Sequence, residues 1–182
     1  MRVLADTLQE NRVVNTLWLL LVSARPRQWT KNSVVFFAYV FSLRDHVDKG
    51  GASEALSTFV DALWAFLLFC LLTSAVYLAN DLIDRTRDRL HPLKARRPLA
   101  SGRLSPGVAG AAAFLLTATG VALSFVLGWR FGTVATVYLL TMLAYNLALK
   151  DIVIVDVMTL AGGFLLRAAA GAVAIDVPIS PW

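Results

Sequence analysis

Three stretches of this chain carry no charged side chain over the length that a helix needs to cross a lipid bilayer: 62–80, 106–129 and 131–149. The hydrocarbon core of a bilayer is about 30 Å thick, and a helix takes roughly 20 residues to span it. Because backbone groups inside the bilayer must be satisfied within the protein, apolar runs of this length indicate helices. The sequence therefore predicts an all-α integral membrane protein.

Two further apolar segments bring the expected number of spans to five. One covers 33–43, or begins at Trp29 if the polar step 30–32 is included, and the last runs from about 152 to 175 with Asp156 and Arg167 inside it. Hydrophobic residues make up 58% of the 182 residues and charged residues only 16%, whereas an average soluble chain has roughly 25% charged residues. This composition excludes a disordered chain, a coiled coil and an ordinary soluble enzyme.

The basic residues are divided unevenly between the two sides of these spans. Of the 17 Lys and Arg residues, 13 lie on the side of the N-terminus, three lie on the other side and one lies within a span. Since cytoplasmic loops are enriched in Lys and Arg, the asymmetry predicts a multi-pass protein of the inner (plasma) membrane with the N-terminus and the 81–105 loop in the cytoplasm. It also accounts for the net charge of +5 with no nucleic acid as a partner.

The two ends of the chain differ from the spans. Residues 1–24 contain a short apolar run with no cleavage site after it, so we expect an N-terminal interfacial helix there and a transmembrane domain over 25–182. Residues 179–182 place a Trp after a Pro, which is typical of the start of another span, so we expect a longer protein truncated at its C-terminal side. The single cysteine, Cys70, excludes an intrachain disulfide.

The strongest sign of chemistry is a group of oxygen-bearing side chains at the end of the second span. Asp81, Asp84 and Asp88 follow Asn80 at spacings of i, i+3 and i+7, which puts the acids on one face of a continuous helix. Crowded carboxylates repel one another unless a cation lies between them, and Mg²⁺ takes one or two carboxylates together with substrate phosphates. The alternative is a solvated helix face whose acids are balanced by neighbouring arginines.

Basic residues accompany the acids in two places. Lys94 and Arg97 lie in the following loop, where they either bind a polyphosphate or mark the cytoplasmic side of the membrane. Arg25 and Lys31 lie in the segment 25–32, for which ordinary membrane anchoring through its tryptophan is the alternative. Lys31 enters the first span, however, and a charge there must face the bundle interior or a watery cavity.

A third polar cluster lies where the fourth span ends and the fifth begins. It contains Tyr145 and Lys150, followed by Asp156 inside the span, where a carboxylate indicates function by default. Arg167 lies further along the same helix and either lines a lumen, pairs with a buried acid or reaches the far headgroups. Because the three clusters converge on one cytoplasmic face, they predict Mg²⁺-dependent diphosphate chemistry above an apolar tunnel for a lipid.

The pattern N-D-x-x-D-x-x-x-D over 80–88 resembles the first aspartate-rich motif of the UbiA prenyltransferase superfamily, and 97–102 resembles the loop that follows it there. The segments 25–32, 145–150 and 166–171 resemble one branch in particular, the decaprenyl-phosphate phosphoribosyltransferases. This resemblance implies a UbiA-type transmembrane helical bundle of nine spans, of which about five are present here, so we expect the 182 residues to be inactive alone.

The resemblance also implies a reaction and its residues. The reaction is Mg²⁺-dependent transfer of 5-phosphoribosyl from phosphoribosyl diphosphate to a polyprenyl (decaprenyl) phosphate, releasing diphosphate and supplying a precursor of cell-wall arabinan. Asn146 and Asp151 depart from the branch's pattern, and either Asp151 or Asp156 serves the second acidic site. The implied catalytic residues are Asp81, Asp84, Asp88 and Asp156, the first three also as Mg²⁺ ligands, and the implied substrate-binding residues are Arg25, Lys31, Asn80, Lys94, Arg97, Tyr145 and Lys150.

Two other functions are compatible with the sequence. A UbiA-type polyprenyltransferase would use the same acidic motif to move a prenyl group from a prenyl diphosphate to an aromatic acceptor. A membrane protein without enzymatic activity, such as part of a transporter or channel, would be expected to carry its charges near mid-membrane. Here they cluster at one face, which argues against a transporter. A homo-oligomer is compatible with either enzyme.

Overall fold

The structure, a computed structural model, describes residues 2–178, with side chains from Arg12 onward except that of residue 49. Residues 179–182, where the sequence suggested the start of another span, lie outside this part. The described chain consists of helices and their connections and contains no strand, so the predicted all-α class is confirmed. In chain order, the elements are α1 (Arg2–Ala24), η1 (Pro26–Phe36), α2 (Phe37–Ile83), α3 (Arg85–Arg89), η2 (Lys94–Arg96), α4 (Pro106–Leu127), α5 (Trp129–Leu147), η3 (Leu149–Asp151) and α6 (Val153–Ala174).

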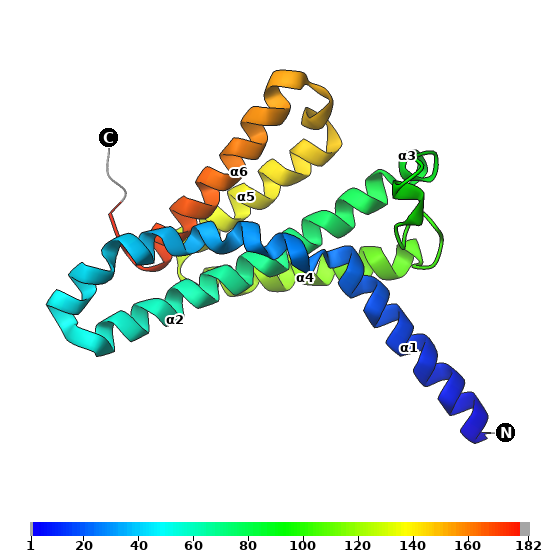
Figure 1. The fold of residues 1–182 in the computed structure, drawn as a ribbon, viewed down its shortest axis with the longest axis horizontal. Helices are drawn as coiled ribbons and strands as arrows, with labels where there is room; N and C mark the ends of the chain where they lie inside the picture. Colours follow the sequence, from blue (N-terminus) through cyan, green and yellow to red (C-terminus); the bar gives the residue numbers. More distant parts are fainter. Residues whose placement is uncertain (1, 179–182) are drawn as a thin grey trace.

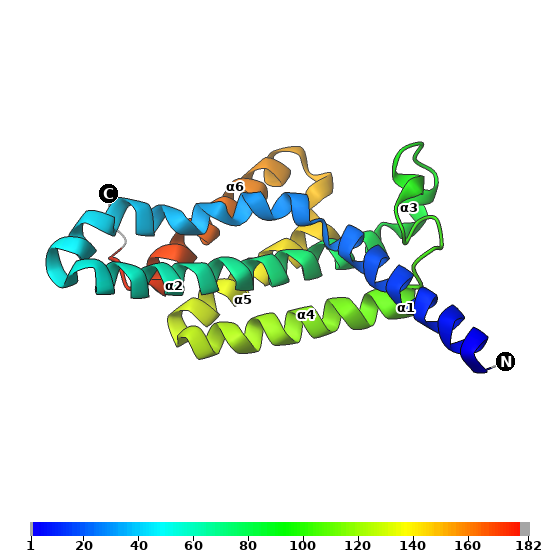
Figure 2. The same cartoon turned by 60° about the horizontal axis from the view of Figure 1, so that its bottom comes forward.

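The helix α2 is bent into two arms at Gly51. This residue has φ 68° and ψ −159°, a backbone conformation that is essentially restricted to glycine. The arm before Gly51 continues from η1 and lies beside the longer arm that follows it (Figures 1 and 2). The first expected span, 33–43, is thus one side of a helical hairpin.

Three helices are long and apolar enough to cross a membrane within the part of the chain that the structure describes: Gly50–Ile83, Pro106–Leu127 and Val153–Ala174. They correspond to the second, third and fifth expected spans. The fourth expected span forms α5, which packs between α4 and α6 in the same bundle (Figure 1). The start of α4 follows the sequence closely, because the hydroxyl of Ser105 accepts a hydrogen bond from the Val108 amide at 3.2 Å just before Pro106.

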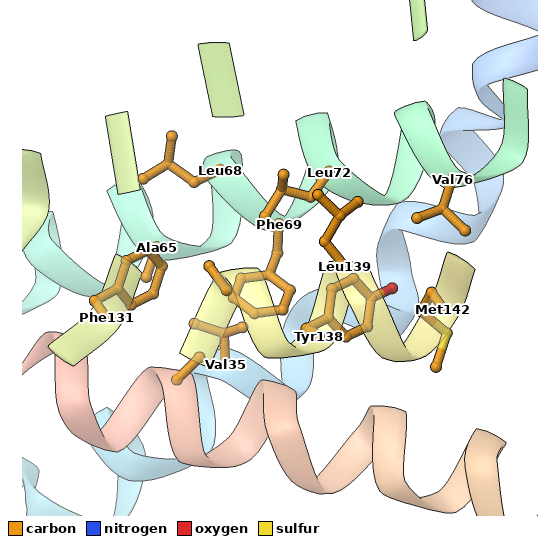
Figure 3. Packing of buried hydrophobic residues seen from close by; sticks show 12 residues of the cluster. Val35, Ala65, Leu68, Phe69, Leu72, Val76, Phe131, Tyr138, Leu139 and Met142 are labelled. Carbon is orange, nitrogen blue, oxygen red and sulfur yellow. The ribbon is translucent and has the colours of Figure 1, made fainter. Parts of the chain in front are cut away.

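Aliphatic and aromatic residues from η1, α2, α5 and α6 form the core of the bundle (Figure 3). The Phe69 ring on α2 packs against the rings of Phe131 and Tyr138 on α5, at centroid distances of 6.0 and 5.0 Å. Behind them η1 crosses α6 closely, because Gly171 lies directly against the backbone of Val35. A side chain at position 171 has no room there, so glycine sets the distance between these two elements.

Most of α1 lies away from the bundle and leaves it obliquely (Figures 1 and 2). Near its C-terminal end, Leu19 packs into a small core with Leu78 and Leu99, whereas Leu17 and Trp18 are 60% and 61% exposed. These exposed apolar side chains are compatible with the interfacial position predicted for residues 1–24, which stays a prediction.

Candidate active site

One cavity of about 440 Å³ opens among α2, α5, α6 and η1, and basic side chains from all three predicted clusters line it. Asp84 is the one carboxylate among its described lining residues. The resulting excess of positive charge suits a ligand that carries several anionic groups. The basic residues at this cavity are Arg25, Lys31, Lys94, Arg97, Lys150 and Arg167.

The 3₁₀ geometry of η1 explains how the segment 25–32 serves both the cavity and the core. A 3₁₀ helix has three residues per turn, so side chains at i, i+3 and i+6 lie on one face. Arg25, Gln28 and Lys31 accordingly line the cavity. The face one residue further on packs inward, where Asn32 is fully buried and the Trp29 indole donates a hydrogen bond to Ser74 at 3.0 Å. The tryptophan is therefore a packing residue of the bundle.

The acidic motif is divided between two places because the helix stops inside it. The last residue of α2 is Ile83, and Asp84 has non-helical dihedral angles (φ −85°, ψ 2°) before α3 begins. The single continuous face expected from the sequence is therefore absent. Asp84 lies on the cavity wall, whereas Asp81 and Asp88 are both buried behind Arg97.

Arg97 connects the two buried acids. Its Nη1 atom lies 3.2 Å from Asp81 Oδ1 and 2.7 Å from Asp88 Oδ2. Asp81 also accepts a hydrogen bond from Arg25, whose guanidinium stacks over the Tyr77 ring at 4.7 Å. Both arginines line the cavity, so the two acids fix the orientation of cations that a ligand can reach.

The loop that carries Arg97 is held by arginines from α3. Arg85 Nε donates a hydrogen bond to the carbonyl of Leu99, and Arg89 Nε donates one to the carbonyl of Ala100. The Leu99 side chain is fully buried beneath. These arginines, which the alternative hypothesis assigned to balancing acids on a solvated helix, instead fix the loop at the cavity mouth.

The third cluster reaches the acidic motif through Lys150. Its Nζ atom lies 2.6 and 2.7 Å from the two oxygens of Asp84. Tyr145 also lines the cavity and donates a hydrogen bond to Asp156 at 2.7 Å. Asp156 itself does not line the cavity and contacts it through Tyr145. Asp151 is exposed and lies 3.5 Å from Arg87.

The inner end of the cavity contains polar residues that the motifs did not identify. Tyr138 and Thr73 line it, and their hydroxyls lie 3.4 Å apart. Tyr138 also accepts a hydrogen bond from Arg167, so of the alternatives for Arg167 the structure supports a position lining an internal cavity. The signal for these residues was a polar side chain within an apolar span. Apolar lining comes from Val76, Met142, Leu160 and Phe164.

The donor set at the mouth fits Mg²⁺. Asn80 and Asp84 bring hard oxygen ligands to the cavity wall beside Lys150 and Arg97, which suit phosphate. Among the side chains that the structure describes, no three from acidic, His or Cys residues are close enough to hold a metal ion by themselves. Mg²⁺ commonly takes only one or two carboxylates and completes its coordination with substrate phosphates and water.

The fold and the cavity together define a helical membrane protein that gathers cations and oxygen ligands at one end of an apolar bundle. The pattern described as the UbiA prenyltransferase family matches residues 50–182, and the chain belongs to this family. The resemblance read from the motif at 80–88 is thereby confirmed.

Comparisons with individual proteins agree with this family. The decaprenyl-phosphate phosphoribosyltransferase of Mycolicibacterium smegmatis is 37% identical over 163 residues, which are 90% of this chain and 50% of that protein. The protein of the same name in Mycobacterium tuberculosis is 39% identical over 158 residues, 87% of this chain and 51% of that protein. The chain thus spans about half the length of these relatives.

A solved structure shows the same fold. It is described as a UbiA homolog from Archaeoglobus fulgidus bound to GPP and Mg²⁺, and it matches with a TM-score of 0.70 at 19% identity. The match covers 90% of this chain and 56% of that one.

Proposed function

We propose that this chain forms the part of an enzyme that binds phosphoribosyl diphosphate and transfers its 5-phosphoribosyl group to a polyprenyl phosphate. The observation that carries the proposal is the set of basic residues around one cavity whose only described carboxylate is Asp84. Phosphoribosyl diphosphate has a diphosphate at C1 and a further phosphate at C5. A prenyl diphosphate carries hydrocarbon in place of that second anionic end.

The reaction balances without an external base. An ionised oxygen of the polyprenyl phosphate attacks C1 of the ribose, the C1–O bond to the diphosphate breaks, and diphosphate leaves with the electron pair. The product is polyprenyl-phosphoryl 5-phosphoribose. Its formation requires that the negative charge developing on the departing diphosphate be stabilised.

The residues at the mouth suit that task. Arg25, Arg97 and Lys150 would bind the oxygens of the diphosphate and hold C1 towards the apolar side of the cavity, with Lys31 and Lys94 beside them. Mg²⁺, when bound by oxygens of Asn80 and Asp84, would supply further neutralisation of the leaving group. Asp81 and Asp88, which the sequence motif also offers as Mg²⁺ ligands, would hold Arg97 beside it. Asp156 would fix the hydroxyl of Tyr145 at the wall, as its 2.7 Å hydrogen bond indicates.

The proposal extends to the location of the site. The predominance of basic residues on one side supports a plasma-membrane protein whose cavity opens to the cytoplasm, where a polar donor such as phosphoribosyl diphosphate is found. The relatives' names support a decaprenyl phosphate as acceptor and, with it, a role in cell-wall arabinan precursor synthesis.

A transfer assay tests the proposal. Membranes containing the full-length protein are expected to move label from phosphoribosyl diphosphate to an added polyprenyl phosphate in the presence of Mg²⁺. Formation of a prenylated aromatic acid from a prenyl diphosphate, with no labelled phospholipid product, would instead establish the polyprenyltransferase alternative.

A further inference from the structure

The inner end of the cavity holds a buried cation that the diphosphate chemistry at the mouth does not use. We propose that Arg167, positioned by Asn32 and Tyr138, binds the phosphate-monoester group of a substrate: the C5 phosphate of the donor or the phosphate of the lipid acceptor. This inference rests on the proposed function, which supplies both candidate sources.

Arg167 is deeply buried and firmly held. Only 7% of the residue is exposed. Its Nε donates a hydrogen bond to Asn32 Oδ1 at 2.8 Å, Nη1 donates to the Gly163 carbonyl at 3.0 Å, and Nη2 donates to the Tyr138 hydroxyl at 2.7 Å. Three elements therefore fix the guanidinium in one orientation, which is the condition for a specific anion site.

The acceptors around Arg167 are all neutral. None of the ion pairs among side chains that the structure describes includes this residue. The guanidinium lies over the rings of Tyr138 and Phe164, at 4.8 and 5.3 Å from their centroids, which offsets part of the cost of burying a charge. A bound anion would supply the remaining compensation.

Donors remain available for such an anion. A guanidinium has five N–H groups, and the three hydrogen bonds above use one each on Nε, Nη1 and Nη2. One N–H on each terminal nitrogen is left, and Arg167 lines the cavity together with the Tyr138 and Thr73 hydroxyls. Paired terminal N–H groups are the usual way in which arginine binds a phosphate.

The contacts of Arg167 separate it from Lys150 at the mouth. Arg167 bonds Asn32 on η1 and Tyr138 on α5. Lys150 pairs with Asp84 at the junction of α2 and α3, so the two cations lie on different parts of the wall of one cavity. The inner cation is therefore suited to a second anionic group while the mouth holds the diphosphate.

The test uses one variant that pairs Arg167 with a carboxylate and one that replaces Arg167. Asn32→Asp changes the acceptor of the Arg167 Nε hydrogen bond into a carboxylate of nearly the same shape, and Arg167→Gln removes the charge. Arg130→Gln is the matched control, because Arg130 is exposed and pairs with Asp176 at 3.5 Å, away from the cavity. For each full-length variant, we would measure the KM for phosphoribosyl diphosphate, the KM for polyprenyl phosphate, and the rise in melting temperature that each compound produces alone.

We expect Asn32→Asp and Arg167→Gln to raise one KM at least about tenfold and to abolish the stabilisation by that same compound. A change confined to phosphoribosyl diphosphate identifies the C5 phosphate as the bound group, and a change confined to the polyprenyl phosphate identifies the acceptor. If folded Asn32→Asp protein keeps both KM values and both stabilisations, the proposal is overturned.

The rise in melting temperature on ligand binding tests this inference separately from the proposed function. If the wild-type protein transfers no phosphoribosyl group, the proposed function fails. The inference then stands only if polyprenyl phosphate or phosphoribosyl diphosphate stabilises the wild-type protein and this stabilisation is lost in Asn32→Asp. Equal stabilisation of both proteins, or of neither, rejects it.

Discussion

Lys150 Nζ lies 2.6 Å from Asp84 Oδ1, although 66 positions separate the two residues along the chain. The side chains are each only 16% exposed. The contact joins the turn after α5 to the junction between α2 and α3, and so brings the third polar cluster to the acidic motif. It also gives Asp84 a cationic partner at the cavity wall, where a substrate phosphate would compete for Lys150.

Replacing Lys150 tests this connection. Lys150→Gln is expected to lower transfer activity by roughly tenfold to a hundredfold, because hydrogen bonds to charged groups are worth about 1.5–3 kcal/mol each. Arg87→Gln is the control, since the nearby Arg87–Asp151 pair is exposed and contributes at most about 1 kcal/mol. Steady-state rates of both full-length variants provide the measurement. Equal rates would mean that Lys150 only contributes to the excess of basic residues on the cytoplasmic side and has no role in transfer.

The acidic motif is expected to respond differently at its two places. Asp84→Asn should lower turnover by orders of magnitude and raise the Mg²⁺ concentration needed for half-maximal rate, with a smaller loss of melting temperature than Asp81→Asn, because Asp84 has one cationic partner, Lys150, where Asp81 has two. Asp81→Asn should reduce turnover as well but lower the melting temperature further, because Arg25 and Arg97 would lose a buried carboxylate. Thermal melts and Mg²⁺ titrations of the two variants would separate these effects. If a variant with Asn at positions 81, 84 and 88 keeps the wild-type rate, the acidic motif has no catalytic role.

The sequence predicted which residues gather at the cavity more successfully than it predicted how they are arranged. Lys31, Lys94, Lys150 and their neighbours could be identified because charges beside an apolar span have few stable positions. The interruption at Asp84 could not be identified, because the spacing of the acids suits a continuous helix equally well. The conformation of the bend was likewise hidden, since the pair Gly50 and Gly51 marks a turn but carries no sign of which residue adopts a positive φ angle.

The sequence also did not predict which side chains of η1 face the cavity and which face the core. Helix patterns are sought at 3.6 residues per turn, whereas Lys31 and Asn32 are assigned to cavity and core by a repeat of three. The contact between Asn32 and Arg167 joins residues 135 positions apart. Only the packing of η1 against α6 brings them together, and no local pattern records it.

That packing depends on Gly171. Gly171→Ala is expected to lower the melting temperature by several degrees, because the added methyl group would overlap the Val35 backbone, which cannot rotate away as a side chain can. Gly162→Ala on the same helix is the control, since a methyl group there meets nothing within 4 Å. Thermal melts in detergent measure both. Equal melting temperatures would show that η1 and α6 separate readily.

Labelling from outside the cell tests the sidedness of the bundle. In a Cys70→Ala background, Leu93→Cys is expected to be protected from an impermeant thiol reagent, whereas Asp48→Cys is expected to react. Both positions are well exposed, with Leu93 74% exposed and the Asp48 side chain 69% exposed, so access to the reagent depends on the membrane alone. The reverse labelling pattern would place the cavity mouth outside the cytoplasm.

The donor decides between the two enzymes, and Lys31 offers the sharpest test of the donor. Both reactions use Mg²⁺ and a diphosphate leaving group, so variants of the acids cannot distinguish them. A phosphoribosyl donor needs additional cationic contacts, and η1 presents Lys31 to the cavity while Arg27, in the same segment, is exposed and absent from its lining. Lys31→Ala should therefore raise the KM for phosphoribosyl diphosphate about tenfold or more, as expected for the loss of one charge-assisted contact.

The matched variant Arg27→Ala should change the same KM less than about twofold, because Arg27 does not line the cavity, and a surface charge outside it contributes little. The two variants remove one positive charge each from the same short helix, so a general loss of surface charge would affect both alike. Steady-state kinetics with labelled donor in membranes of the full-length protein compare them directly. If both variants raise the KM for phosphoribosyl diphosphate equally, the orientation of η1 does not select the substrate. Prenyl transfer by either variant at the wild-type rate would favour the aromatic prenyltransferase reaction.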